Sequence, residues 1–259
     1  MFLLGIVALY FTQHFILSDA WERVEIFADR FEDDRIDVTK WNVADAATAT
    51  LTSNGPVGSE HVLVQPVVTN VWEKEHKMFL ITNETSWKNF TTSHVDTRDK
   101  FSFTYGEVEW TVQMPLGHGV SAVLSLIPDY CNDPCQHRID ILYRGDVPNR
   151  VTFMVQSSYE MHSVQHDGIE VTIPGSFAMG FNRFKILWDD QQLKFYVNPQ
   201  DGQPENFAVT DNRPLLPHVP MHLEMSSSVG GWYEGLPSVL FATLPSFLII
   251  EEVTVHRWQ

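Results

Sequence analysis

The chain has few cysteines, a deficit of basic residues and no long apolar run. Two cysteines allow at most one internal disulfide. Lys and Arg number 17 against 33 Asp and Glu, and the formal net charge of −16 argues against nucleic acid and anionic membranes as partners. The N-terminal apolar run, residues 2–11, is too short for a helix that needs about 20 residues to cross a bilayer, so we expect no membrane insertion.

The N-terminal run instead resembles a secretion signal. It is followed by Ser18-Asp19-Ala20, whose small first and third residues suit signal peptidase. We therefore expect residues 1–20 to be a signal peptide and residues 21–259 to form a single domain, because the chain is 44% hydrophobic and can bury one large core. The protein is predicted to be secreted and extracellular.

Secretion determines how two further patterns are interpreted. Asn83 and Asn89 each begin an Asn-x-Thr triplet, so both are predicted N-glycosylation acceptors on a loop or an exposed strand. Cys131 and Cys135 are close in sequence, and in an oxidising compartment we expect them to form a disulfide.

No stretch shows a sustained helical period of 3.6 residues, which excludes a helical fold. Apolar residues alternate with polar ones over Phe101–Tyr105, and the alternation shifts by one residue at Gly106 before it continues to Met114. Such a shift predicts a β-bulge at Gly106. Further strands are expected over residues 151–156, 184–188, 193–197 and 247–256, and the whole pattern predicts an all-β sandwich.

The chain carries no Ser-His-Asp order, phosphate loop or dinucleotide fingerprint in a supporting context. It does carry five segments that, in this order, resemble those of glycoside hydrolase family 16, the laminarinase and β-glucanase family. They are YGEVEWTVQMPLGHGVSAVLSLIP from Tyr105, RIDIL-YRG from Arg138, FNRFKILWDDQQLKFYVN from Phe181, MHLEMSSSVGGW from Met221 and IIEEVTVHRW from Ile249. The resemblance implies a concanavalin A-like jelly roll, in which two antiparallel sheets pack together and a glycan cleft lies on the concave face.

The second segment resembles the family's catalytic strand, where an ExDxE pattern places three carboxyls on one face. A retaining glycosidase needs two carboxyls about 5–5.5 Å apart, one as nucleophile and one as acid and base. Here the pattern has Arg138, Asp140 and Leu142, or Tyr143 in the third position if the strand carries an extra residue. An arginine has no free lone pair, a leucine has no proton to donate, and tyrosine has a pKa near 10.

The sequence therefore predicts that no catalytic residue pair remains on this strand. Asp140 is expected to be an ion-pair partner of Arg138 on the cleft face, while Ile139 and Ile141 point into the core.

The resemblance also identifies other cleft positions. Ser121 and Ser125 stand where the family has two tryptophans, which removes two faces for sugar stacking. Gln156 stands in place of a histidine. Trp232, with Tyr233 beside it, matches a cleft aromatic, although a core tryptophan is the competing interpretation.

No cofactor is required for glycan binding, but the family often holds a structural calcium ion near its first and last strands. Glu251 matches the acidic position of the last strand, and Asp29 is a candidate contributor. A solvated acidic edge would explain the same two residues.

Three functions remain open. The leading hypothesis is a secreted, non-catalytic protein that binds a β-1,3-glucan or a related polysaccharide, similar to the glucan recognition proteins of invertebrate innate immunity. The second is an active retaining endo-β-glucanase whose catalytic residues are displaced, and its mark would be a second carboxylate within reach of Asp140. The third is a structural protein of an extracellular coat that binds protein partners.

Overall fold

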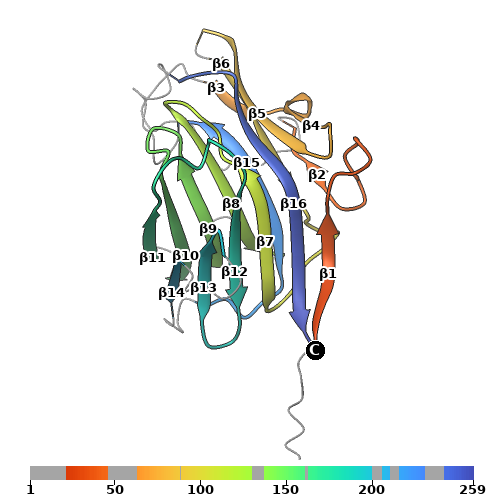
Figure 1. The fold of residues 1–259 in the computed structure, drawn as a ribbon, viewed down its shortest axis with the longest axis vertical. Coiled ribbons are helices and arrows are strands. Elements are labelled where there is room, and N and C mark those ends of the chain that lie inside the picture. The colour runs from red at the N-terminus through yellow and green to blue at the C-terminus, as the bar shows by residue number, and fades with distance from the viewer. Residues whose placement is uncertain are drawn as a thin grey trace, which may run out of the picture.

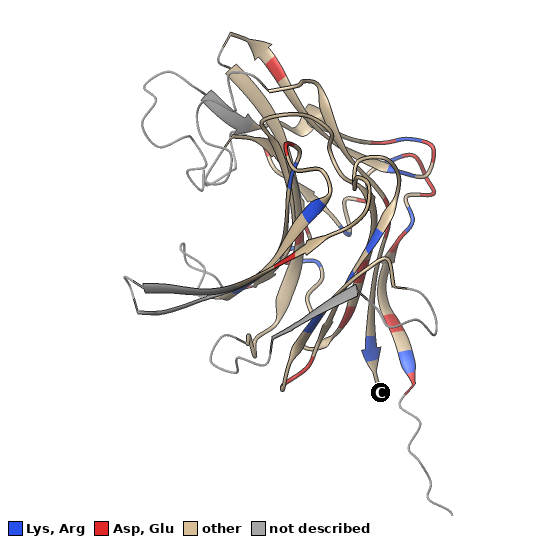
Figure 2. Cartoon of the chain, turned by 60° about the vertical axis from the view of Figure 1, so that its left-hand side comes forward, with Lys and Arg blue, Asp and Glu red and all other residues tan. Residues whose placement is uncertain are grey.

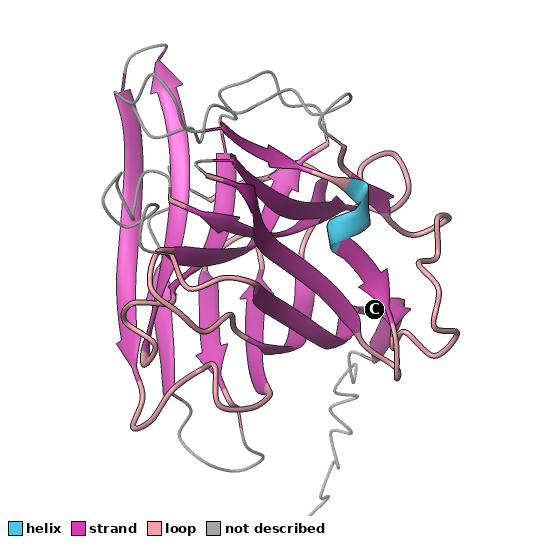
Figure 3. Cartoon of the chain, turned by 90° about the horizontal axis from the view of Figure 1, so that it is seen from above, coloured by secondary structure: helices cyan, strands magenta, loops and turns pink. Residues whose placement is uncertain are grey.

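A computed structural model of the chain describes residues 22–45, 63–87, 89–129, 137–160, 163–199, 206–210, 216–230 and 242–259. Within these ranges the regular structure is almost entirely β-strand, with a single short 3-10 helix, η1, over Val68–Asn70 (Figures 1 and 3). None of the described helical structure is long and apolar enough to cross a membrane.

Sixteen strands form the described fold. In chain order the first eight are β1 Arg23–Asp29, β2 Asn42–Val43, β3 Leu63–Pro66, β4 Val71–Glu73, β5 Met78–Ser86, β6 Asn89–Asp96, β7 Gly106–Gln113 and β8 Val120–Pro128. The other eight are β9 His137–Arg144, β10 Arg150–Glu160, β11 Ser163–Thr172, β12 Asn182–Trp188, β13 Leu193–Val197, β14 Asn206–Thr210, β15 Met221–Val229 and β16 Ser246–Trp258.

The strands are hydrogen-bonded in one continuous path that curls on itself. Its order is β11-β10-β9-β8-β15-β6-β5-β16-β7-β12-β13-β14, with β1 added beside β16, β2 and β3 beside β6, and β4 beside β5. The pairing is antiparallel except between β3 and β6. Because the path curls, the half with β8–β11 and β15 packs as a curved layer over the half with β7, β12, β13 and β16 (Figures 1 and 2).

Period-two alternation explains why these segments fold in two layers. In β13 the side chains at Leu193, Phe195 and Val197 are buried, and the two between them are half-buried. Each strand therefore turns one apolar face toward the other layer, and these faces form one core. The largest fully buried side chains in this core include Trp41, Trp110, Trp188, Phe103, Phe153, Phe177, Phe184 and Phe195.

The strands expected from sequence are confirmed at residues 151–156, 184–188, 193–197 and 247–256, all within β10, β12, β13 and β16. The expected bulge at Gly106 is wrong. Before Gly106 only Phe103 makes an isolated bridge, and β7 begins at Gly106 itself. Tyr105 has a φ of 61° and Gly106 a φ of 144°, so the chain turns there between two separate segments. A Cβ on Gly106 would lie 2.4 Å from the His256 carbonyl oxygen, which explains the glycine.

Candidate functional site

The candidate site is centred on β9, which lies in the middle of the curved layer between β8 and β10. Both pairings are regular along the strand, with no bulge. Ile139 and Ile141 are fully buried in the core between the layers. Arg138 and Asp140 therefore lie on the opposite, concave face, as the alternation predicts.

The regular register also settles the third position of the pattern. Leu142 follows Asp140 on the concave face and pairs with Val123 of β8. Tyr143 belongs to the core, is 1% exposed, and packs edge-on against Phe177. Burial raises the pKa of the Tyr143 phenol above its usual value, so it is even less suited to proton transfer. The alternative register with Tyr143 in the cleft is therefore wrong.

Arg138 and Asp140 form a compact ion pair. The Arg138 Nε donates to both carboxylate oxygens of Asp140, at 2.6 and 2.8 Å. The Ser125 hydroxyl, on the neighbouring strand, donates to Asp140 Oδ1 at 2.5 Å and accepts from an Arg138 Nη2 at 3.0 Å. Burial raises the pKa of Asp140, whose residue is 1% exposed, while the charge of Arg138 and the bond from Ser125 oppose that rise.

A second carboxylate lies on the far side of the same guanidinium. Glu224 of β15 pairs with Ser125 of β8, and Ser125 pairs with Asp140, so the three stand in one row across three strands. Arg138 Nη2 is 3.3 Å from Glu224 Oε1. One guanidinium therefore bridges two carboxylates.

The row continues onto β6, where two more titratable residues adjoin Glu224. His94 Nε2 lies 3.4 Å from Asp96 Oδ2 and 3.8 Å from Glu224 Oε2. Although burial opposes it, the hydrogen bonds from His94 and from the Asn42 amide lower the pKa of Asp96 to about 2. Burial lowers the pKa of His94, but the charges of Glu224 and Asp96 outweigh it and the net direction is upward.

Neither Glu224 nor the pair on β6 was identified from the sequence. The signal was present, because Glu224 lies in the quoted MHLEMSSSVGGW segment and shares a strand face with Ser226 and Ser228. What the segment does not reveal is which strand lies beside it.

The remaining predicted cleft residues have separate outcomes. Ser125 is fully buried in the ion-pair network, so it does not mark an open stacking surface. Gln156 pairs with Arg138 in the ladder of β9 and β10, and its side chain lies outside the described part. Trp232, Tyr233, Cys131 and Cys135 also lie outside the described residues, so the aromatic contact and the disulfide remain predictions.

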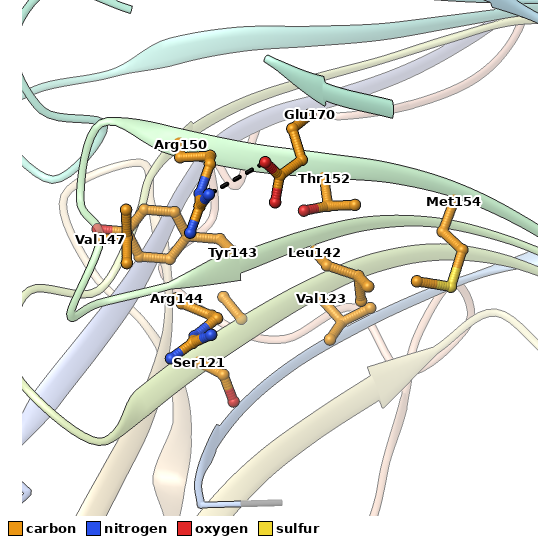
Figure 4. Close-up of a pocket in the computed structure, with 11 residues that line it drawn as sticks. Ser121, Val123, Leu142, Tyr143, Arg144, Val147, Arg150, Thr152, Met154 and Glu170 are labelled. Carbon is orange, nitrogen blue, oxygen red and sulfur yellow. Dashed lines mark hydrogen bonds and ion pairs between the residues drawn. The ribbon is translucent and has the colours of Figure 1, made fainter. Parts of the chain in front are cut away.

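Ser121 lines a cavity of about 230 Å³ that begins beside Leu142 on the concave face (Figure 4). The floor comes from β8, β9 and β10, with Glu170 of β11 at one side. The lining residues are Ser121, Ala122, Val123, Leu142, Tyr143, Arg144, Val147, Arg150, Thr152, Met154 and Glu170.

The acidic residues proposed for calcium lie on β1 and β16. Asp29 accepts a hydrogen bond from the Trp41 indole at 2.7 Å and one from the Phe31 backbone N–H at 3.1 Å, and the Lys40 ammonium is 3.5 Å away. These donors do not fit a cation at Asp29. Glu251 is exposed at a bulge of β16. No described group of three or more His, Cys, Asp or Glu has metal-binding geometry.

Both predicted glycosylation acceptors lie on the hairpin of β5 and β6. Asn83 pairs with Thr91, and Asn89 pairs with Ser86 next to the turn. Both side chains are partly exposed on strands, which is compatible with the expected position. Their modification remains a prediction.

The curled all-β sandwich is the same fold as that of solved jelly-roll structures. The catalytic domain of an endo-1,3-β-glucanase (laminarinase) from Thermotoga petrophila superposes with a TM-score of 0.78 at 19% identity, covering 92% of this chain and 99% of that chain. An endo-β-1,3-glucanase from Pyrococcus furiosus superposes with a TM-score of 0.76 at 18% identity, covering 93% and 97%. The predicted jelly-roll fold is thereby confirmed.

The family follows from the sequence itself. The model of glycosyl hydrolases family 16 matches residues 64–236, so this chain belongs to that family. Glucan endo-1,3-β-glucosidase A1 of Niallia circulans is 22% identical over 260 residues, covering 90% of this chain and 38% of that protein. A β-glucanase of Rhodothermus marinus is 27% identical over 183 residues, covering 66% of this chain and 64% of that protein. The matches therefore span less than two thirds of either relative.

Proposed function

We propose that this family 16 chain is a secreted protein that binds a β-1,3-glucan or a related polysaccharide without cutting it. The observation that carries the proposal is the double contact of the Arg138 Nε with both oxygens of Asp140, at 2.6 and 2.8 Å. A nucleophilic carboxylate must offer a free oxygen lone pair to the anomeric carbon. Asp140 instead has a side chain only 2% exposed beneath a guanidinium.

The second catalytic role is also unfilled on β9. Leu142 occupies the next concave position and has no proton to transfer. Loss of general acid-base help alone typically lowers a rate by about 10²–10⁴-fold, and loss of the nucleophile adds to it. This pattern supports a recognition role similar to that of invertebrate β-1,3-glucan recognition proteins.

The test is an assay of purified protein on laminarin and on mixed-linkage glucan. We expect reducing ends to stay at background while either polymer retards the protein in affinity electrophoresis. Trp232→Ala and Tyr233→Ala should weaken that retardation, and Trp87→Ala should not, because Trp87 is an exposed aromatic at the turn between β5 and β6. Reducing ends that increase with protein and disappear in Asp140→Asn would overturn the proposal.

A second experiment introduces a carboxyl pair by substitution. Arg138→Glu combined with Leu142→Glu places two carboxyls on the concave face of β9, yet we expect little activity. Without Arg138, the added glutamate lies beside Asp140 and Glu224 with no cation between them, and Ser121 and Ser125 supply no ring to position a sugar.

Glu224 is the specific observation that favours the second candidate, an active retaining endo-β-glucanase. It provides the second carboxylate near Asp140, 3.3 Å from the Arg138 Nη2. The two carboxylates lie on strands with β8 between them, so their backbones are roughly 9–10 Å apart. The Arg138 guanidinium contacts both carboxylates and so occupies the space in which a sugar would have to react, and binding without hydrolysis is therefore the better-supported function. Hydrolysis that is lost in Glu224→Gln would reverse this ranking.

A further inference from the structure

The cavity beside Leu142 has a character different from that of the row around Asp140. Its volume of about 230 Å³ is below the roughly 300–1,000 Å³ of pockets that take drug-sized ligands, so it suits about one sugar ring. Val123, Leu142 and Met154 form an apolar surface along its floor. Arg144 and Arg150 both lie toward the other end (Figure 4).

The segment that lines the cavity differs in charge from the chain as a whole. The formal net charge of the chain is −16, but residues 138–150 contain three arginines and two aspartates. An ExDxE strand would hold three negative charges on its cleft face. With Arg138, Asp140 and Leu142 in those positions, the formal charges of the three side chains sum to zero. Arg138 and Leu142 therefore lower the repulsion that an anionic ligand would meet on this face, although Glu224 and Asp96 remain in the neighbouring row.

Each arginine at the cavity has a carboxylate partner, in an exposed pair at Arg150 and in a partly buried, double contact at Arg144. Arg150 Nη1 is 3.0 Å from Glu170 Oε2, and the two side chains are 34% and 56% exposed. Arg144 Nη2 is 2.7 Å from Asp146 Oδ2, with exposures of 38% and 20%. Exposed ion pairs are weak, so a ligand anion can replace Glu170 beside Arg150 at low cost.

We propose that this cavity binds a sugar unit that carries an anionic group, a carboxylate or a sulfate ester, with Arg144 and Arg150 on the anion and Val123, Leu142 and Met154 under the ring. The proposal rests on the proposed function, that the chain binds a polysaccharide, and adds which chemical class it prefers. Planar guanidinium groups are suited to both carboxylate and sulfate oxygens.

Isothermal titration at low salt compares three ligands of similar length: neutral laminari-oligosaccharides, oligogalacturonates and sulfated laminari-oligosaccharides. We expect at least one anionic ligand to bind about tenfold tighter than the neutral one, and its affinity to fall as salt is added. Comparing the oligogalacturonates, which carry carboxylates, with the sulfated oligosaccharides shows which anion the cavity accepts. A protein with so negative a charge disfavours non-specific polyanion binding, so a positive result is informative.

Two substitutions in one ion pair should shift the affinity in opposite directions. Arg150→Gln should weaken anion binding about tenfold, and Glu170→Gln should strengthen it a few-fold because it removes the competing carboxylate. Misfolding would not produce tighter binding, so a gain in affinity in Glu170→Gln shows that the loss in Arg150→Gln is not due to misfolding at this site. Arg183→Gln is the matched control, since Arg183 is a 47% exposed arginine on β12, in the other layer.

Each outcome decides the proposal. Anionic preference with the two opposite shifts supports it, even if the neutral ligand fails to bind and the neutral-glucan part of the proposed function is lost. Equal affinity for neutral and anionic ligands overturns it while leaving the proposed function intact. Anion binding unaffected by Arg150→Gln and Glu170→Gln also overturns it, and no binding of any ligand overturns both.

Discussion

Two buried carboxyl groups, Asp140 in the concave layer and Glu73 on β4, have opposite surroundings. Asp140 is 1% exposed and its oxygens accept hydrogen bonds from Arg138 and Ser125. Glu73 is 8% exposed, and neither of its oxygens has a hydrogen-bond partner of good geometry among the described residues. Burial, reinforced by the charges of Asp29 and Asp33, raises the pKa of Glu73 to about 7.

The comparison shows that burial does not by itself determine the state of a carboxyl group. A counter-charge in contact keeps Asp140 as part of an ion pair, whereas Glu73 reduces its desolvation cost by holding a proton. Removing the partner of a charged buried group strongly destabilises the fold, whereas a neutral buried group carries no such penalty. The two sites should therefore respond differently when their charges are changed.

The largest expected effect is at the concave site. Arg138→Gln should lower the free energy of unfolding by about 3–5 kcal/mol at pH 7, because it leaves Asp140 and Glu224 without the guanidinium between them. Urea denaturation measures the change. The double variant Arg138→Gln/Asp140→Asn should recover most of the loss, and a double variant no more stable than the single one would contradict the pairing.

The next largest effect is at Glu73, where removing the charge should raise the free energy of unfolding and not lower it. Its folded pKa of about 7 lies above the ordinary glutamate value of 4.5, so the native state binds this proton more tightly than the unfolded state. The stability it contributes is fully present below about pH 4.5 and is lost as the pH rises through about 7. Glu73→Gln should therefore raise the free energy of unfolding by roughly 3 kcal/mol at pH 8 and by little at pH 4.

Urea midpoints of the variant and the parent at the two pH values test this difference. Glu75→Gln is the matched control, because the Glu75 side chain is 74% exposed in the next turn and should change stability by less than about 0.5 kcal/mol. An equal effect of Glu73→Gln at both pH values would show that the carboxyl is not protonated in the native state.

The smallest effect sharpens the contrast between buried and exposed pairs. A double-mutant cycle on Arg150 and Glu170 should give a coupling energy below about 1 kcal/mol, since both side chains are substantially exposed. The same cycle on Arg138 and Asp140 should give several times more. A strong coupling at Arg150 and Glu170 would mean that a ligand anion cannot displace Glu170 cheaply.

Much of the fold was predictable from local pattern. The alternation in β12 and β13 placed the strands, and the order of the five quoted segments identified the family that the profile match over residues 64–236 shows. The faces of Ile139 and Asp140 also followed from the period of a strand. At Gly106 the same reasoning failed, because a turn between two segments and a bulge within one strand shift the alternation in the same way.

The site was predictable only in part. The sequence identified Arg138 and Asp140 as neighbours on one strand face, but it left Leu142 and Tyr143 as alternatives. A bulge is decided by hydrogen bonding to β8 and β10, which a strand's own residues do not reveal. Nor could the sequence show that the Glu73 oxygens have no hydrogen-bond partner of good geometry among the described residues, since that depends on every segment that surrounds them.

By itself the sequence determined the strand pattern, the family and the placement of Arg138 and Asp140 on one strand face, because each depends on residue identity and spacing along one chain. Only the tertiary structure decided that Glu224 shares Arg138 with Asp140, that Ser125 is buried beneath the guanidinium, and that Arg144 and Arg150 meet at one cavity. The physical reason is that Arg138 and Glu224 are 86 residues apart, and antiparallel pairing through β8 brings them together.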